Sequence, residues 1–181
     1  MITFKQNQIL EISQKFNDSQ VIALPTDTVY GLAAKYNDEK AIAEIYKIKN
    51  RGHNKPLPIL VGSWEQAKLV GIISEDLQRF LTTNFKEGKV TVIVAKQPML
   101  NTPYWITKSS VAIRVSASSF IKKITAILGP LVATSCNISN ELPITDYKLI
   151  NLPKLKYKVM GEILDNKPST IYDSFTGKII R

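Results

Sequence analysis

The most constraining feature of this sequence is a short apolar segment that runs directly into a proline and a dense polar turn. Residues 21–24 have the length and composition of a buried strand, and Pro25 cannot continue a central ladder because it has no amide donor. Four hydrogen-bonding side chains then crowd into the turn before Gly31: Thr26, Asp27, Thr28 and Tyr30. Because loops at strand ends hold the ligands of many α/β proteins, this turn is a candidate binding loop. The alternative is a turn whose hydroxyls only satisfy nearby backbone groups.

Strands and helices alternate along the rest of the chain. Asp38, Ser63 and Ser74 are candidate helix N-caps, and Tyr46, Phe80 and Phe120 lie at core-facing positions of the predicted helices. Strands are predicted at residues 59–61, 90–95, 111–115, 131–134, 159–164, 170–172 and 178–180. We therefore expect an α/β fold with a mixed, twisted β-sheet flanked by helices.

Length and composition narrow the classes of protein that this chain can represent. We expect one domain over residues 1–181. The sequence has neither an apolar run of membrane-spanning length nor a secretory leader pattern, and we therefore expect a cytoplasmic protein. With Cys136 and His53 as the only cysteine and histidine, we expect no protein-held metal site. The 24 Lys and Arg residues against 15 Asp and Glu give a net charge of +9, which favours anionic partners.

Arg114 is the most unusual single residue, because it lies inside the apolar strand predicted at residues 111–115. A buried guanidinium needs an anionic partner. That partner is either a ligand, which the planar donor fork of arginine would suit, or an Asp or Glu of this chain. The sequence leaves both open.

Polar residues gather at the ends of four predicted elements, and such ends can converge on one cleft. The clusters are the turn after Pro25, residues 49–55, Arg114 with Ser110, and Ser135 with Asn137. Ser135 and Asn137 could bind a nucleotide or simply hold a tight turn. Cys136 between them is expected to be a packed residue, since no histidine lies nearby in the sequence to activate it. The stretch 140–158 is either a lid or an ordinary surface excursion.

Together these clusters resemble the YrdC/TsaC family of threonylcarbamoyl-AMP synthases, over nearly the whole chain past about residue 20. The matching motifs, in order, are Pro25-Thr26-Asp27-Thr28-Val29-Tyr30-Gly31-Leu32, Lys49-x-Arg51 with Lys55-Pro56-Leu57, Val111-Ala112-Ile113-Arg114-Val115, Gly129-Pro130-Leu131-Val132-Ala133-Thr134-Ser135-Cys136-Asn137-Ile138-Ser139, Ser169-Thr170-Ile171, and Ile180-Arg181. The resemblance implies a YrdC-like fold, and we expect no additional C-terminal domain.

The resemblance also implies a reaction in which L-threonine, bicarbonate and ATP, with Mg²⁺, give L-threonylcarbamoyladenylate and pyrophosphate. A downstream threonylcarbamoyl transferase would then modify tRNA. The positive charge of the protein also favours direct contact with RNA. The reaction needs positioning and charge stabilisation but no protein nucleophile.

Roles follow residue by residue from the matching motifs. The resemblance makes Lys49 and Arg51 catalytic residues at the ATP phosphates. Threonine would be bound by Thr26, Arg114 and Ser169. ATP would be bound by Arg51, Lys55, Ser110, Ser135, Asn137 and Arg181. No residue is expected to hold a metal.

Two departures from the family pattern bear on the site. Ser116 stands where the family has proline, which should loosen that loop, and Asn140 stands where glycine is common, although asparagine tolerates a positive φ.

A non-catalytic double-stranded RNA-binding module is the rival hypothesis. It explains the positive charge, but the basic residues are not interleaved with exposed aromatic side chains.

Overall fold

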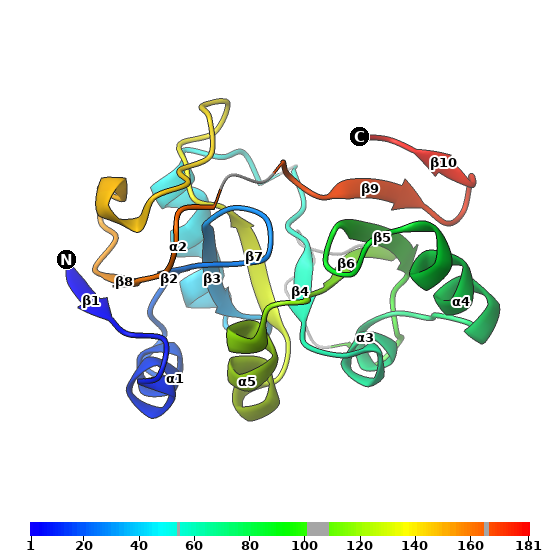
Figure 1. The fold of residues 1–181 in the computed structure, drawn as a ribbon, viewed down its shortest axis with the longest axis horizontal. Helices are drawn as coiled ribbons and strands as arrows, with labels where there is room; N and C mark the ends of the chain where they lie inside the picture. Colours follow the sequence, from blue (N-terminus) through cyan, green and yellow to red (C-terminus); the bar gives the residue numbers. More distant parts are fainter. Residues whose placement is uncertain (54, 101–108, 165–166) are drawn as a thin grey trace.

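The protein folds into one mixed β-sheet with helices on both faces, as seen in the computed structural model, which describes residues 1–53, 55–100, 109–164 and 167–181 (Figure 1). The strand order across the described sheet is β1-β8-β2-β3-β7-β4-β6-β5-β9-β10. The strands are β1 (Ile2–Phe4), β2 (Ile22–Leu24), β3 (Gly31–Lys35), β4 (Ile59–Val61), β5 (Val90–Ala95), β6 (Ser110–Val115), β7 (Leu131–Ser135), β8 (Tyr157–Val159), β9 (Thr170–Asp173) and β10 (Lys178–Ile179). The expected α/β architecture is confirmed.

Helices begin where the sequence provides a capping side chain. Asp38, Ser63 and Ser74 each accept a hydrogen bond from the amide three residues on, as predicted. The helices are α1 (Ile9–Asn17), α2 (Glu39–Lys49), α3 (Trp64–Val70), α4 (Glu75–Asn84), α5 (Ser119–Leu128) and the 3₁₀ turn η1 (Tyr147–Leu149). Helix α2 ends at Asn50, which adopts the left-handed conformation (φ 49°) that terminates many helices.

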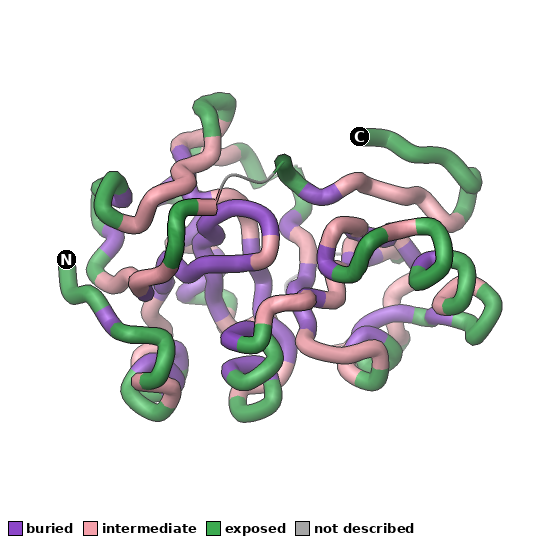
Figure 2. Tube along the Cα trace, viewed as in Figure 1, coloured by how far each residue is buried: buried purple, intermediate pink, exposed green. Residues whose placement is uncertain are grey.

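The sheet separates two apolar cores. One core, on the face covered by α2, α3 and α4, contains alternate strand residues such as Val61 and Ile113. The other core, beneath α1 and α5, contains Leu60, Leu131 and Phe120. Figure 2 shows the buried central strands between helices whose outer surfaces are exposed. Because side chains alternate along β6, Val111, Ile113 and Val115 project toward the face covered by α2, α3 and α4. Ala112 and Arg114 project toward the opposite face.

Several sequence-based expectations were wrong in detail. The strand predicted at residues 159–164 shares only Val159 with β8, which covers residues 157–159. Phe80 was expected to face the core but is 40% exposed, although its ring packs beside those of Phe85 and Tyr172. Elements β1, α1 and β3 were not predicted. None of the helices in the described part of the chain is long and apolar enough to span a bilayer.

The stretch 140–158 is tied to the body of the protein at its C-terminal end. Ile150, Leu152 and Leu155 are buried in the first core, and η1 and the start of β8 lie within the stretch. Asn140 has a φ of 75°, so the asparagine does accept the conformation for which glycine is commonly used.

Candidate active site

The candidate active site is a cavity of about 470 Å³ on the face of the sheet that carries Ala112 and Arg114. It is bounded by the turn after β2, the end of β7, the loop after α2 and the start of β9. Seven of the ten residues predicted from the sequence line it: Thr26, Arg51, Arg114, Ser135, Asn137, Ser169 and Arg181. Polar clusters that are far apart in the chain therefore do converge on one cavity.

The other three predicted residues, Lys49, Lys55 and Ser110, do not line this cavity. Lys55 is exposed in the loop after α2. Ser110 begins β6, four residues before Arg114, and therefore projects from the same face of the strand but farther along it. Lys49 is the last residue of α2 and is buried.

The turn after β2 is organised by its own hydroxyls. Thr26 Oγ1 donates to the Val29 carbonyl at 2.7 Å and accepts from the Thr28 amide at 3.1 Å, while lying 3.0 Å from Thr28 Oγ1. Both threonines are buried yet line the cavity. The two interpretations of this turn are thus compatible, because its hydroxyls satisfy local groups and also border the candidate site.

Arg114 reaches this turn from the middle of the sheet. Its Nη1 donates to Thr28 Oγ1 at 2.6 Å, and its Nη2 lies 3.4 Å from Asp27 Oδ1. Burial lowers the pKa of Arg114, and the negative charge of Asp27 opposes that shift. The internal ion pair that the sequence left open is present. Arg114 nevertheless faces the cavity, with its charge only loosely compensated.

Asp27 is the centre of a polar group that sequence reasoning did not include in the site. Ser116 Oγ donates to Asp27 Oδ1 at 2.6 Å, and Lys89 Nζ donates to the Asp27 backbone carbonyl. Asp27 Oδ2 is buried without a hydrogen-bond partner among the described residues. The polar turn was a signal for Asp27, whereas Ser116 stood out in the sequence only as a substitution for the proline of the family. The loop at Ser116 is therefore held by a specific bond, and its loosening relative to a loop with proline stays a prediction.

Ser169 and Arg181 are joined on the opposite side of the cavity. Ser169 Oγ lies 2.7 Å from Thr91 Oγ1, and Arg181 Nη2 donates to the Ser169 carbonyl at 3.1 Å. Thr91 belongs to β5, the strand that pairs with both β6 and β9. The strand pairing thus places Ser169 and Arg114 around the same cavity.

Ser135, the last residue of β7, and Asn137, which follows the strand, are linked to each other. Ser135 Oγ donates to Asn137 Oδ1 at 2.7 Å, and Asn137 Nδ2 donates to the Glu141 carbonyl at 2.6 Å. Lys49 Nζ also bonds to this pair. Nearby, Arg51 is held by its own loop, donating to the carbonyls of Lys55 and Pro56 at 3.2 and 3.1 Å.

Cys136, between these two residues, is fully buried. Burial raises the pKa of its thiol to about 12, so the thiol stays protonated near neutral pH. A protonated thiol is a poor nucleophile, consistent with the expected packing role. Among the described residues, no group of three or more His, Cys, Asp or Glu side chains could hold a metal ion.

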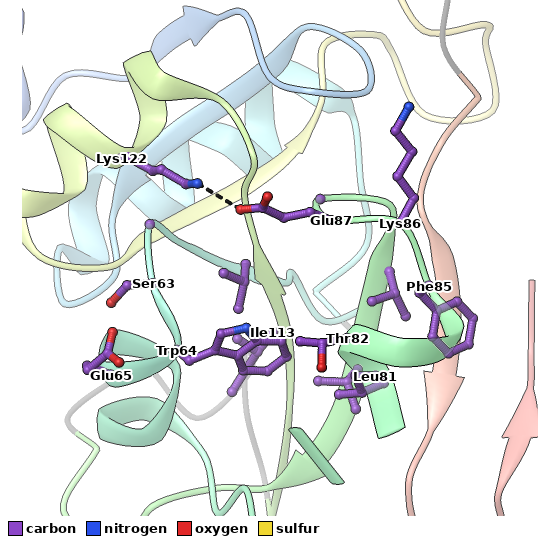
Figure 3. Close-up of a pocket in the computed structure, with 15 residues that line it drawn as sticks. Ser63, Trp64, Glu65, Leu81, Thr82, Phe85, Lys86, Glu87, Ile113 and Lys122 are labelled. Carbon is purple, nitrogen blue, oxygen red and sulfur yellow. Dashed lines mark hydrogen bonds and ion pairs between the residues drawn. The ribbon is translucent and has the colours of Figure 1, made fainter. Parts of the chain in front are cut away.

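A second cavity of about 460 Å³ lies on the opposite face of the sheet, against Val92, Ile113 and Val115 (Figure 3). Its walls come from α3 and from the loop after α4, and Lys122 pairs with Glu87 at 2.7 Å at its edge. None of the ten predicted residues lines it. Because binding sites combine apolar walls with convergent polar groups, the first cavity is the stronger candidate for the active site.

The fold and site together define an α/β protein with a basic ligand cavity that contains no glycine-rich phosphate loop. The Sua5_yciO_yrdC family model, described as "Telomere recombination", matches residues 14–181. The chain therefore belongs to the Sua5/YciO/YrdC family.

Relatives in both sequence and structure agree with this assignment. Threonylcarbamoyl-AMP synthases from Blochmanniella floridana and Yersinia enterocolitica are 36% and 32% identical, each match covering 94% of this chain and 93% of the relative. The crystal structure of P. abyssi Sua5 complexed with L-threonine superposes with a TM-score of 0.85 at 26% identity, over 97% of this chain. The chain spans about half, 55%, of that Sua5 protein. E. coli YciO shares the fold, with a TM-score of 0.85 at 21% identity.

Proposed function

We propose that this protein is a threonylcarbamoyl-AMP synthase, which forms L-threonylcarbamoyladenylate and pyrophosphate from L-threonine, bicarbonate and ATP. The observation that carries the proposal is the convergence of Arg114, Ser169, Arg51 and Asn137 on one cavity from four separate segments. The names of the relatives, and the threonine complex of P. abyssi Sua5, support the same activity.

Threonine would bind at the end of the cavity formed by Thr26, Arg114 and Ser169. A guanidinium has five donor hydrogens, and the described residues accept bonds from it at two points, Thr28 and Asp27. Donors therefore remain for the carboxylate of the amino acid. The paired hydroxyls of Ser169 and Thr91 lie across the cavity, where they can bind a small polar substrate.

ATP would bind at the other end, beside Ser135 and Asn137. Arg51 supplies a cation at the cavity wall, and its guanidinium is oriented in advance by the two loop carbonyls. Lys55 in the same loop, Ser110 farther along the sheet and Arg181 are further proposed contacts for ATP. Mg²⁺ would arrive with the ATP phosphates, which supply oxygen ligands of the kind it prefers.

The chemistry that this arrangement would support is an in-line displacement at phosphorus. Bicarbonate takes up a proton and loses water to give CO₂. The neutral amine of threonine adds to the CO₂ carbon and releases a proton to solvent, which gives a carbamate. A carbamate oxygen then attacks the α-phosphorus and pyrophosphate leaves with the bond electrons. Arg51 would offset negative charge on the phosphates, and the cavity walls would hold the two substrates in register.

The test is to incubate the purified protein with ATP, Mg²⁺, bicarbonate and threonine, and to detect threonylcarbamoyladenylate and pyrophosphate by mass spectrometry. Product should require threonine and bicarbonate together, because the attacking carbamate contains both. ATP alone should be nearly inert. Equal ATP consumption with and without threonine would identify a generic ATPase and overturn the proposal.

The product would pass to a separate threonylcarbamoyl transferase that modifies tRNA, which would place the protein in the cytoplasm. Any direct contact between this protein and tRNA would be a weak interaction driven by the positive charge of the protein. A non-catalytic double-stranded RNA-binding module is not favoured, because the relatives are named as threonylcarbamoyl-AMP synthases. Tyr46 and Phe120 are buried and cannot stack on bases, whereas Phe80 is 40% exposed.

A further inference from the structure

Lys49 is a buried cation surrounded by oxygen atoms. Its residue is 1% exposed, and its Nζ donates to the Ser135 carbonyl at 2.5 Å, the Asn137 carbonyl at 2.8 Å and Asn137 Oδ1 at 2.7 Å. An ammonium has three donor hydrogens, so these three acceptors use all of them. Burial, followed by the charge of Arg51, lowers the pKa of Lys49 to about 8.

Lys49 forms hydrogen bonds with both ends of the turn at residues 135–139. The Ser139 amide donates to the Lys49 carbonyl at 2.8 Å, while the Lys49 ammonium holds the two carbonyls and the amide oxygen before it. Asn137 Oδ1 also accepts from Ser135 Oγ. The C-terminus of α2 and residues 135–139 thus form one hydrogen-bonded unit.

The same bonds hold the ammonium outside the lining of the cavity. Ser135 and Asn137 line the cavity, but Lys49 lies behind them and does not. To reach a phosphate, Lys49 would have to release the two buried oxygen atoms of Asn137 and the part-buried carbonyl of Ser135, and leaving buried acceptors unpaired is costly. Arg51, two residues later, does line the cavity.

We propose that Lys49 is a positioning residue, which fixes residues 135–137 for ATP binding and does not itself touch the nucleotide. This inference rests on the proposed ATP site and reassigns one residue of it. Lys49 acts through Ser135 and Asn137, and the direct cation at the phosphates is Arg51.

A double-mutant cycle on ATP affinity separates positioning from direct contact. Lys49→Met removes the charge but keeps an unbranched side chain that is one atom shorter, and should weaken ATP binding roughly tenfold or more. In the Asn137→Ala background the same change should cost clearly less than in the wild type, because one of the three acceptors through which Lys49 acts, Asn137 Oδ1, is gone while the two backbone carbonyls remain. A full, additive loss in that background would show direct contact and overturn the proposal.

Two matched variants calibrate the cycle. Arg51→Met should add its full effect to Asn137→Ala, because Arg51 is the proposed direct contact. Lys47→Met removes an exposed cation of the same helix, paired only on the surface with Glu44, and should leave ATP affinity unchanged. Far-ultraviolet circular dichroism and a melting curve for each variant check that it is folded.

A measurement on the wild-type protein keeps the proposal testable if Lys49→Met does not fold. Heteronuclear NMR of the lysine ammonium groups should show one slowly exchanging signal, from Lys49, that persists when ATP is added. Loss of that signal on ATP binding, or its absence from the free protein, would overturn the positioning role. If the wild-type protein binds no ATP at all, the proposed function fails, while the free-protein spectrum still tests the contacts of Lys49.

Discussion

The Nη2 atom of Arg114 lies 3.4 Å from Oδ1 of Asp27, a residue 87 positions earlier in the chain. Neither side chain is more than 12% exposed. The pair joins the middle of the sheet to the turn after β2, and Ser116 shares the same carboxylate oxygen at 2.6 Å. The proposed threonine end of the cavity therefore depends on a buried polar group whose members come from distant segments.

Arg114→Lys should raise the threonine requirement while leaving ATP binding nearly intact. Lysine keeps the positive charge but loses the planar donor fork, so we expect a loss of roughly 1.5 to 3 kcal/mol in threonine affinity. Separate titrations of threonine and ATP against the wild type and the variant measure this. Arg79→Lys, on the exposed face of α4, is the matched control and should change neither affinity.

The opposite result is equally clear. If Arg114 serves only the internal ion pair, the variant should melt at a lower temperature and lose affinity for both ligands together. An unchanged threonine dependence in a stably folded variant would rule out the assigned role.

Gly88→Ala should disturb the Asp27 group directly. Gly88 has a φ of +75°, and a Cβ atom there would lie 1.7 Å from Asp27 Oδ2 and 3.0 Å from the Ala117 amide nitrogen. Gly177 has a similar φ of +69° but no atom within 4 Å of its added Cβ, so Gly177→Ala carries the backbone strain alone. We expect Gly88→Ala to cost about 1 to 3 kcal/mol more in unfolding free energy than Gly177→Ala.

Chemical denaturation of both glycine variants measures that difference, and a threonine titration should show weaker binding only for Gly88→Ala. Equal stability of the two variants would mean that Asp27 can move aside freely and does not hold Arg114.

Cys136 should make stability fall at alkaline pH. The pKa of its thiol is raised by burial from an ordinary 9.0 to about 12, so the folded protein retains a proton that the unfolded chain releases. The resulting stabilisation is complete below pH 9 and is lost as the pH rises toward 12. Comparing urea denaturation of the wild type and Cys136→Ala between pH 8 and 10.5 isolates this effect, since Tyr30 and Lys49 are common to both proteins.

The wild type should lose stability with rising pH relative to Cys136→Ala. The thiol should also resist dithionitrobenzoate until the protein unfolds. Rapid labelling of the folded protein at pH 8 would instead mean that the thiol is accessible and ionised.

Small-molecule ligands should stabilise the protein at physiological salt, whereas RNA should not. At a hundred times its own dissociation constant, each of the two ligands, ATP and threonine, should add about 2.7 kcal/mol, or about 5 to 10 °C in melting temperature. RNA affinity based on the positive charge should fall steeply as salt rises. Melting curves insensitive to both small ligands, with tight RNA binding at that salt, would favour the RNA-binding module.

Local patterns allowed much of the fold to be predicted, because they depend on neighbouring residues alone. Asp38, Ser63 and Ser74 each cap a helix by accepting a hydrogen bond from the amide three residues later in the chain. The apolar runs at β5 and β7 are long enough to identify strands. Helix α1 carried a signal that was overlooked, since Ile9, Ile12 and Phe16 have helical spacing. Strand β3 carried almost none, because its Gly-Leu-Ala-Ala-Lys sequence is extended mainly by pairing with β2 and β7.

The sequence by itself determined the polar motifs and the α/β class, and it identified Arg114 as a charge in need of a partner. Only the tertiary structure decided which partners those charges have. Asp27 meets Arg114, and Lys49 meets Asn137, through strand and helix packing across 87 and 88 residues. Such contacts depend on which strands pair and in what register, and these are properties of the whole chain rather than of any local segment.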